Sequence, residues 1–366
     1  MHDIVPIKSI RTSAYVIPTN GPEGDGTLDW DSTTMVLVEI QAGGKTGLGY
    51  TYGHEAIVQV IEKTFKRLLQ GMDALQVPFI TETMMKAIRN NGNCGIAMMA
   101  VSAVDIALWD LKAKLFDIPL TSLLGTVQKE ILLYGSGGFT SYNDSQLEEQ
   151  LGAWVDMGIK HVKIKIGRSL VRDMERVQLA RRIIGRDVEL YIDANGAYNI
   201  REAISIAHKF EGCNISWFEE PVSSDNLAGL NFIRSHVPPS MAIAAGEYGY
   251  NMAYFQKMLA SSSVDILQAD ATRCGGITTF LAVDKLCCSY QAPYSSHCAS
   301  AIHLHASMAS VSFFIAEYFY DHTRIENMLL DASAIIEDGC MKPDMTRPGM
   351  GFDFKHKDAE PYKIIG

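Results

Sequence analysis

The first 125 residues combine alternating apolar and polar positions with two helical patterns. Segments 8–17, 35–40 and 46–50 alternate as strands do, and the Gly43-Gly44 pair predicts a turn between the last two, so we expect an antiparallel meander. Apolar positions at helical spacing predict helices over 57–69 and 96–115. The pattern therefore predicts an α+β domain over residues 1–125.

Beyond residue 125, short apolar runs alternate regularly with amphipathic helical patterns, such as 145–157, 170–184 and 201–210. Such alternation favours a parallel sheet. The eight strand-forming runs are 131–134, 161–166, 189–192, 215–218, 241–245, 265–269, a run near Ala292, and 312–316. Eight units in roughly 190 residues favour a closed barrel over an open sheet. We expect this barrel over 126–320, and a Pro- and Gly-containing tail, 321–366, that packs back on the first domain.

Composition and charge narrow the class of protein. The 366 residues are 47% hydrophobic and 20% charged, as in ordinary globular proteins. There are 32 Lys and Arg against 42 Asp and Glu, with no basic run, which argues against nucleic acid and anionic membranes as partners. The first residues lack the apolar core of a signal peptide, and the seven cysteines form no C-x-x-C pair. We therefore expect a cytoplasmic protein with reduced thiols.

Polar residues recur where the predicted barrel strands end. From the second strand onward they follow one another at steps of 20 to 28 residues, about one βα unit each. The residues are Lys163 and Lys165, then Asp193, Glu219, Glu247, Asp270, His297 and Glu317. In a barrel all of these positions meet at one mouth, which is the face where barrel active sites form.

Three of these residues, Asp193, Glu219 and Glu247, are carboxylates on adjacent strands. They offer hard oxygen ligands without the cysteines or paired histidines that zinc prefers, so we expect Mg²⁺, which could polarise a substrate carboxylate or hydroxyl. The alternative for any one of them is a cap on the helix that follows its strand. Three unpaired acids in register would repel strongly, which favours the metal site.

Two further groups are candidate bases. Lys163 and Lys165 alternate on one strand, so they point to the same side, and inside a barrel each would lower the pKa of the other. A lysine with a lowered pKa is a usable base near neutral pH, whereas a solvated pair on an edge strand would not be. Asp270 occupies the place on its strand that His297 occupies on the next, and an Asp–imidazole hydrogen bond would fix the tautomer of the ring. Taken alone, His297 is more often a structural residue than a base.

Motifs along nearly the whole chain resemble one family. Residues 107–114, Ala-Leu-Trp-Asp-Leu-Lys-Ala-Lys, with Pro119-Leu120, resemble the helix of its N-terminal domain. The barrel half carries Lys163-Ile164-Lys165, Asp193-Ala194-Asn195-Gly196, Phe218-Glu219-Glu220-Pro221, Gly246-Glu247, Asp270 with Arg273 and Gly275-Gly276, His297, and Glu317. Together these motifs resemble the enolase superfamily and, within it, the mandelate racemase subgroup.

The resemblance implies a modified (β/α)7β TIM-like barrel with an N-terminal α+β capping domain, and Mg²⁺ held by Asp193, Glu219 and Glu247. It implies removal of the proton α to a carboxylate to give an enediolate. The implied site residues are Lys165 on one side of the α-carbon, the His297/Asp270 dyad on the other, Lys163 depressing the pKa of Lys165, Glu317 on the substrate carboxylate, and Asn195 on a substrate hydroxyl.

Within this subgroup the resemblance favours a lyase that dehydrates an acid sugar, an aldonate or aldarate, to a 2-keto-3-deoxy acid, with His297 protonating the departing β-hydroxyl. The alternative is a racemase, epimerase or cycloisomerase of a 2-hydroxy or sugar acid that uses the same residues, and a remote one is a non-catalytic binding protein. A homo-oligomer is expected by resemblance only. Tyr248 and Cys298 depart from the pattern of mandelate-active members, which argues against mandelate as the substrate.

The segment 18–34 is long and rich in Gly, Pro and Asp, which predicts a lid over the site. With Trp30, Tyr52 and His54 it would form a polar roof suited to a polyhydroxy chain. No Lys or Arg falls between Thr12 and Gly44, which favours a monoacid over a diacid unless Arg273 or another barrel residue pairs with a distal carboxylate. The alternative is a disordered, solvated loop.

Overall fold

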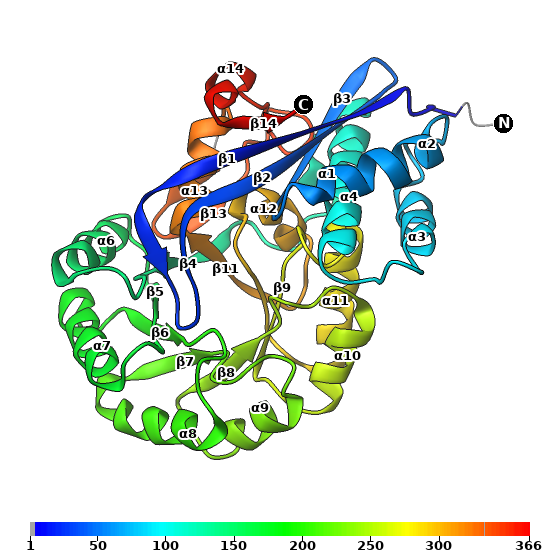
Figure 1. The fold of residues 1–366 in the computed structure, drawn as a ribbon. Coiled ribbons are helices and arrows are strands. Elements are labelled where there is room, and N and C mark those ends of the chain that lie inside the picture. The colour runs from blue at the N-terminus through cyan, green and yellow to red at the C-terminus, as the bar shows by residue number, and fades with distance from the viewer. Residues whose placement is uncertain (1–3, 333) are drawn as a thin grey trace.

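The computed structural model describes residues 4–332 and 334–366, so residues 1–3 of the predicted first domain and residue 333 of the predicted tail lie outside the described residues. An antiparallel sheet with the strand order β14-β1-β2-β3 forms the upper part of the molecule in Figure 1. Its strands are β1 (Ser9–Gly24), β2 (Asp29–Ala42), β3 (Lys45–Tyr52) and β14 (Lys363–Ile365). The predicted meander is confirmed, and two of its strands extend well past the predicted ends.

Helices pack on one side of this sheet. They are α1 (Ala56–Val60), η1 (Ile61–Phe65), α2 (Lys66–Leu69), α3 (Val77–Ala87) and α4 (Ile96–Leu115), and the short α5 (Leu120–Leu124) follows outside this layer. The first three run on from one another within the predicted helix, and α4 matches its prediction. The helix α3 was not predicted; it has Pro78 in its first turn and no side-chain cap hydrogen bond. These helices and the sheet enclose a separate apolar core.

Eight parallel strands form the lower part of the molecule, and all eight predicted strands are confirmed. The strands are β4 (Ile131–Gly137), β5 (His161–Lys165), β6 (Glu189–Asp193), β7 (Ile215–Glu219), β8 (Ala242–Ala245), β9 (Ile266–Ala269), β10 (Tyr294–Ser296) and β11 (Phe313–Phe319). Because β11 pairs in parallel with β4 as well as with β10, the sheet closes into the predicted barrel.

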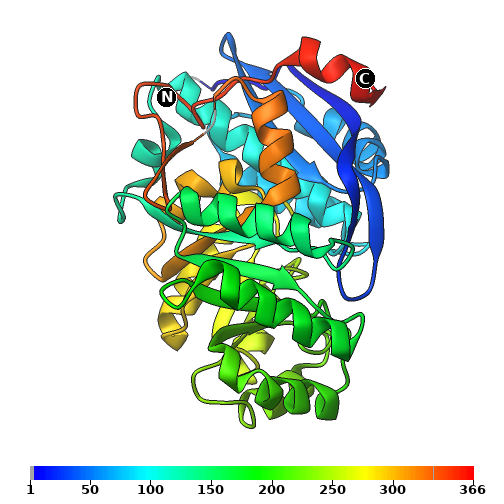
Figure 2. The same cartoon turned by 90° about the vertical axis from the view of Figure 1, so that its left-hand side faces the viewer.

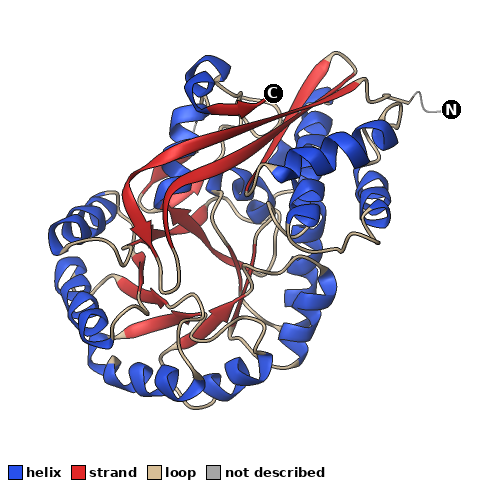
Figure 3. Cartoon of the chain, in the orientation of Figure 1, coloured by secondary structure: helices blue, strands red, loops and turns tan. Residues whose placement is uncertain are grey.

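Seven helices connect these strands and surround them as an outer ring (Figure 3). They are α6 (Asp144–Asp156), α7 (Leu170–Ile184), α8 (Ile200–Lys209), α9 (Leu227–Arg234), α10 (Met252–Ala260), α11 (Gly276–Tyr290) and α12 (Ser300–Met308). Local sequence fixes where several begin: Asn143 and Asn199 each start a capping box with the residue three positions later. The predicted fold class, a barrel with an α+β cap, is therefore confirmed.

The last segment of the chain contacts both halves. It contains α13 (Tyr320–Leu329), β12 (Ile335–Glu337), β13 (Cys340–Lys342), α14 (His356–Ala359) and η3 (Glu360–Tyr362) before β14. β13 pairs antiparallel with β4 of the barrel, whereas β14 pairs antiparallel with β1 of the cap. The tail thus returns to the cap, and on its way it adds two strands to the barrel sheet.

The segment 18–34 is an ordered hairpin, so the alternative of a disordered, solvated loop is wrong. β1 and β2 stay paired out to Gly24 and Asp29, with a register shift between Pro18 and Glu23. The hairpin reaches from the cap across the barrel strands (Figures 1 and 2). Its tip fits closely there, because a Cβ at Gly26 would lie only 2.4 Å from the carbonyl oxygen of Ala194.

Large aromatic side chains close the barrel beneath its mouth. Tyr134, Tyr191 and Trp217 form an apolar cluster on the strands β4, β6 and β7, and the Tyr191 and Trp217 rings stack at 4.9 Å. The barrel interior beneath the polar residues at the strand ends is therefore filled by packed side chains. Within 4–332 and 334–366, no helix is both long and apolar enough to cross a membrane.

Candidate active site

A cavity of about 290 Å³ lies between the barrel mouth and the hairpin. The barrel, the cap and the tail all contribute to its wall, since Lys165, Trp30 and His322 each line it. The predicted site residues that line it are Trp30, Tyr52, Lys165, Asn195, Glu247, Arg273, His297 and Glu317. The structure thus brings most of the predicted site together around one space.

The three predicted metal ligands lie side by side. Asp193 and Glu219 are the last residues of β6 and β7, and Glu247 follows β8 by two residues. One oxygen from each lies within 4.8 Å of the others, and the three side chains are buried. Glu247 Oε2 has no hydrogen-bond partner among the described residues. A buried carboxylate oxygen without a partner fits a site that a cation completes.

The charge around these oxygens also fits a divalent cation. Burial raises the pKa of Glu219 well above its usual range; Lys163 opposes this shift, and the neighbouring Asp193 adds to it. Burial also raises the pKa of Glu220, which follows it, and the charges of Glu247, Asp193 and Glu219 add to this shift, against Lys165. The neighbouring lysines therefore do not fully compensate the negative charge of these buried carboxylates. A hard cation such as Mg²⁺ accepts an all-oxygen set of this kind.

Lys163 lies beneath the cavity and does not line it. Its Nζ is fully buried, 2.5 Å from Glu219 Oε1 and 2.9 Å from Glu317 Oε1, and sits over the ring of Tyr134. Because β5 lies between β4 and β6, the alternative of a solvated pair on an edge strand is wrong. Lys163 balances charge beneath the site.

Lys165 lines the cavity, with its Nζ 2.5 Å from Asp193 Oδ2. Burial lowers the pKa of this ammonium and Lys163 lowers it further, but the charges of Asp193 and other carboxylates raise it more, so it lies above its ordinary value. The prediction of a lowered pKa is therefore wrong for this arrangement, because it counted one neighbouring cation and omitted the neighbouring anions.

His297 and Asp270 form the predicted pair. Nδ1 of His297 lies 2.9 Å from Asp270 Oδ2, and the backbone N–H of Thr272 donates to Asp270 Oδ1 at 2.7 Å. Burial alone would raise the pKa of Asp270, but its hydrogen bond to His297 and the nearby positive charges hold it below its usual range. An ionised Asp270 keeps the proton on Nδ1 and leaves Nε2 free to exchange a proton.

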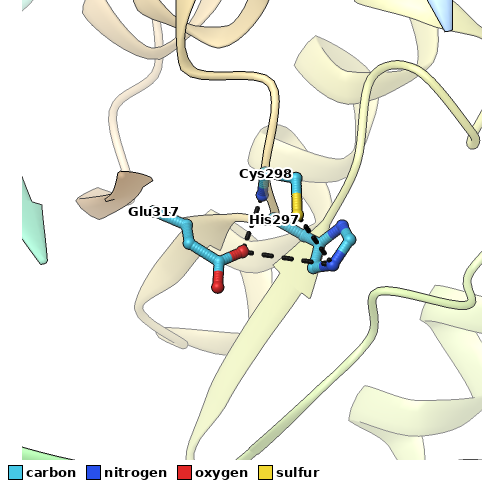
Figure 4. A group of neighbouring side chains, drawn as sticks. All are labelled: His297, Cys298 and Glu317. Atoms are coloured by element: carbon cyan, nitrogen blue, oxygen red, sulfur yellow. Dashed lines mark hydrogen bonds and ion pairs between the residues drawn. The ribbon is translucent and has the colours of Figure 1, made fainter. Parts of the chain in front are cut away.

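Glu317 and Cys298 meet His297 at one wall of the cavity (Figure 4). Glu317 Oε2 accepts from the backbone N–H of Cys298 at 2.7 Å and lies 4.0 Å from His297 Nε2. The Cys298 thiol lies 3.2 Å from the same Nε2. Nothing in the sequence pattern predicted that this thiol would contact the imidazole.

Arg273 and Asn195 complete the polar lining from the barrel. Arg273 Nε lies 3.5 Å from Asp270 Oδ2, and its Nη1 lies 3.7 Å from Glu247 Oε1. The guanidinium stands over the ring of Tyr248, so its charge is already paired within the site. Oδ1 of Asn195 is buried and has no hydrogen-bond partner in the described part of the chain, which leaves it available to a ligand.

The hairpin and the cap supply an aromatic and hydroxyl-rich roof. Trp30 Nε1 donates to Glu23 Oε2 at 3.0 Å. Tyr52 stacks on His322 of the tail with ring centroids 3.6 Å apart. Thr33 donates to Asp321 at 2.5 Å, which fixes the hairpin to α13. The histidine was not predicted, because the tail carries no periodic pattern that points toward the barrel mouth.

His54 does not join this roof, which corrects the prediction that it lines the pocket. Its side chain is 68% exposed and lies 3.5 Å from Glu55. The backbone N–H of Ala56 donates to its Nδ1 at 3.1 Å, so His54 binds the start of α1.

Comparison with known proteins assigns the family. Residues 146–359 match the family model described as enolase C-terminal domain-like, and residues 26–125 match the N-terminal domain of mandelate racemase and muconate lactonizing enzyme. An arabinonate dehydratase from Saccharolobus solfataricus is 31% identical over 90% of each chain.

Two solved structures support the same assignment. A mandelate racemase/muconate lactonizing enzyme-like protein from Rubrobacter xylanophilus is 48% identical, with a TM-score of 0.96 over 98% of this chain and 100% of that one. A racemase from Streptomyces coelicolor A3(2), solved with bound magnesium, is 28% identical, with a TM-score of 0.92 over 98% of this chain and 100% of that one. The chain belongs to the mandelate racemase group of the enolase superfamily, and it is a lyase or isomerase.

Proposed function

We propose that this protein is a Mg²⁺-dependent acid-sugar dehydratase that forms a 2-keto-3-deoxy acid. The observation that carries the proposal is that Lys165 and His297, which is paired with Asp270, line the same cavity as Glu247, next to the carboxylate cluster. The dehydratase name of the relative from S. solfataricus and the magnesium in the S. coelicolor structure support it.

The reaction needs a base for the α-proton and an acid for the β-hydroxyl. Lys165, once neutral, takes the proton from the α-carbon, and Glu317 is the residue that the resemblance places at the substrate carboxylate. His297, protonated at Nε2 and held by Asp270, gives its proton to the departing hydroxyl. Asp193, Glu219 and Glu247 would hold Mg²⁺, which when bound would supply positive charge against the enediolate that develops.

Neutral Lys165 requires the removal of the negative field that raises its pKa. Asp193 is the largest source of that field, and it is also one of the three proposed ligands. A carboxylate that ligates a dication raises the pKa of a neighbouring ammonium less. Lys163 then lowers the Lys165 pKa, as the sequence analysis expected.

The roof favours an uncharged, hydroxyl-bearing chain at the distal end of the substrate. Ser32, Thr33 and Thr34 line it and carry no charge. The two arginines that reach the hairpin, Arg168 and Arg324, bind its backbone and are not among the lining residues. We propose a monoacid, an aldonate, as the substrate.

Incubation with Mg²⁺ and a panel of aldonates and aldarates in D₂O tests the proposal, with a 2-keto acid assay and proton NMR as readouts. A keto product from an aldonate is the expected result. Deuterium at C2 without a keto product, in a reaction that needs Lys165 or His297, would replace the dehydratase by a racemase, epimerase or cycloisomerase. If no acid gives a keto product or takes up deuterium at C2, the proposed chemistry is wrong.

A further inference from the structure

The proposed dehydration gives Cys298 no role, although its thiol lines the cavity beside the imidazole of His297. The thiol, the imidazole and the carboxylate of Glu317 are respectively 4%, 7% and 1% exposed. One donor atom from each lies within 4.8 Å of the other two (Figure 4). Sulfur, nitrogen and oxygen donors therefore converge at one point of the cavity wall.

The spacing of these atoms is close to that of a tetrahedral metal site. Bonds of about 2.0–2.3 Å to Zn²⁺ at tetrahedral angles place donor atoms roughly 3.3–3.6 Å apart. His297 Nε2 lies 3.2 Å from Cys298 Sγ and 4.0 Å from Glu317 Oε2. The distance from Nε2 to Sγ already fits one ion, whereas Nε2 to Oε2 is longer than it requires and Sγ lies within 4.8 Å of the carboxylate. Side-chain movements would therefore have to bring Glu317 closer, and the cavity supplies the fourth, open position.

The surroundings of the imidazole already have the form that a zinc ligand requires. A metal-bound histidine usually donates its other ring N–H to a carboxylate, which fixes the ring and raises its basicity. Asp270 accepts from Nδ1 of His297 at 2.9 Å and is itself held by the Thr272 N–H at 2.7 Å. The same pair that would serve proton transfer thus presents Nε2 as a ligand.

The backbone at this point holds the thiol toward the imidazole. Cys298 and Ala299 have φ angles of 50° and 40°, a left-handed conformation that residues other than glycine rarely adopt. The chain turns sharply between β10 and α12 there, and the backbone N–H of Cys298 is fixed by Glu317. The surrounding structure therefore imposes this conformation, and thiol and carboxylate are positioned together.

We propose that His297, Cys298 and Glu317 form a second metal site, selective for Zn²⁺ over Mg²⁺, whose occupation blocks the active site. Mg²⁺ takes oxygen ligands, whereas Zn²⁺ binds thiolate and imidazole strongly. Binding forms a metal–sulfur bond and releases the thiol proton to buffer, with no change of oxidation state. The charges of Glu317, Asp270 and Glu247 act on this thiol against the single guanidinium of Arg273, so the net charge around it favours a dication.

Zn²⁺ at this site would block the reaction because it occupies a residue that the reaction uses. Zn²⁺ on Nε2 removes the lone pair that would carry the proton, and the ion occupies space in a cavity of about 290 Å³. This consequence depends on the proposed function, because it assigns proton transfer to His297. Metal binding itself does not depend on it, so the experiment measures binding directly.

Co²⁺, titrated into the full-length protein in excess Mg²⁺, is the probe. A cobalt–thiolate bond gives an intense near-ultraviolet charge-transfer band, whereas cobalt on three carboxylates gives none. We expect this band to saturate at one Co²⁺ per chain and Zn²⁺ to displace it. Cys298→Ser should abolish the band and weaken Zn²⁺ affinity at least tenfold, and His297→Asn should weaken it similarly.

Two matched variants identify the site. Cys94→Ser removes an exposed thiol and should leave the band unchanged, as should Asp193→Asn, which alters the proposed Mg²⁺ site. No band in the parent protein, a band that persists in Cys298→Ser, or a band lost with Asp193→Asn would overturn the proposal. If the band behaves as expected but Zn²⁺ leaves turnover unchanged, the metal site exists and does not block the reaction. The role of His297 in the proposed function is then wrong.

Discussion

The two sides of the active-site cavity are built in different ways. On the barrel side, buried ionic groups stand at strand ends and each is held by others, as Lys163 is by Glu219 and Glu317. On the cap side, a hairpin brings Trp30 and uncharged hydroxyl groups over the opening, and hydrogen bonds such as that of Thr33 to Asp321 fix it.

This difference separates the tasks of the two sides. A group that accepts or stabilises charge in a transition state must be fixed before the reaction, which buried networks on a closed sheet achieve. A roof that rests on a hairpin can vary its side chains without disturbing those networks. Substitutions on the barrel side should therefore lower kcat, and those on the roof should change KM or substrate preference.

Glu219→Gln should have the largest effect. The variant removes one of three proposed ligand charges and leaves an amide where Trp217 and Gln268 both donate to Oε2. We expect kcat to fall at least about a thousandfold, since a metal ion supplies several kcal/mol of charge stabilisation. Mg²⁺ titration calorimetry alongside turnover checks it.

The exposed Glu211→Gln is the matched control and should leave both measurements unchanged. If Glu219→Gln retained the parent's Mg²⁺ affinity and kcat, the three carboxylates would not be the metal site.

Asp270→Asn should lower kcat by about 10² to 10⁴, the range that a general acid or base contributes. The amide cannot hold the imidazole in the same tautomer or stabilise its charged form, so Nε2 loses its role. Because Asp270 acts through His297, the pH profile of kcat should also change, which a merely structural role would not cause. If the variant kept the parent's pH profile and kcat, the His297/Asp270 pair would have no role in the reaction.

Trp30→Phe tests the roof. The ring contact with Phe139 at 5.6 Å is retained, whereas the hydrogen bond to Glu23 is lost. A single hydrogen bond of about 1 kcal/mol corresponds to roughly a fivefold change, so KM should rise by about that factor with kcat nearly constant. His54→Ala, exposed and outside the cavity, should leave both constants unchanged. A fall in kcat without a rise in KM would contradict the division between the two sides.

The barrel side could be predicted from sequence because its strands and helices repeat at a regular spacing along the chain. Each βα unit places one strand end at the same mouth, so the spacing of Asp193, Glu219 and Glu247 already put them together. The structure agrees with that placement. What spacing could not give is the balance of charge: the pKa of Lys165 depends on how close Asp193 comes, at 2.5 Å.

The roof could be predicted only in part: Trp30 and Tyr52 line the cavity as expected, but the contacts that fix the hairpin are long-range. Gly, Pro and Asp in 18–34 are typical of a loop, and the segment becomes a hairpin because its tip packs against the barrel. Thr140 and Arg168 bind the backbone of Asp25 and Gly24 there. His322 enters the cavity from a helix of the tail, far from the motifs of the barrel.

The hairpin also contains a titratable group whose effect on turnover should be small and whose effect on stability should be measurable. Glu23 is 1% exposed, and burial, with Asp321 adding its charge, raises the pKa of Glu23 to about 8, against the smaller opposing effects of the Trp30 hydrogen bond and of Arg324. The neutral carboxyl is thus favoured in the folded protein, while the unfolded chain ionises near its ordinary value of 4.5.

The stability that Glu23 contributes is therefore complete below about pH 4.5, is lost as the pH rises toward 8, and changes no further above that. Between pH 5 and 8 the loss should be about 2–4 kcal/mol. Glu23→Gln keeps an acceptor for Trp30 without a charge, so its free energy of unfolding should exceed the parent's by a margin that grows from pH 5 to 8, with kcat unchanged. Urea unfolding at each pH measures this margin, with the exposed Glu55→Gln as control. A margin independent of pH would mean that Glu23 stays ionised in the folded hairpin, and the roof would then present an unpaired negative charge above the substrate chain.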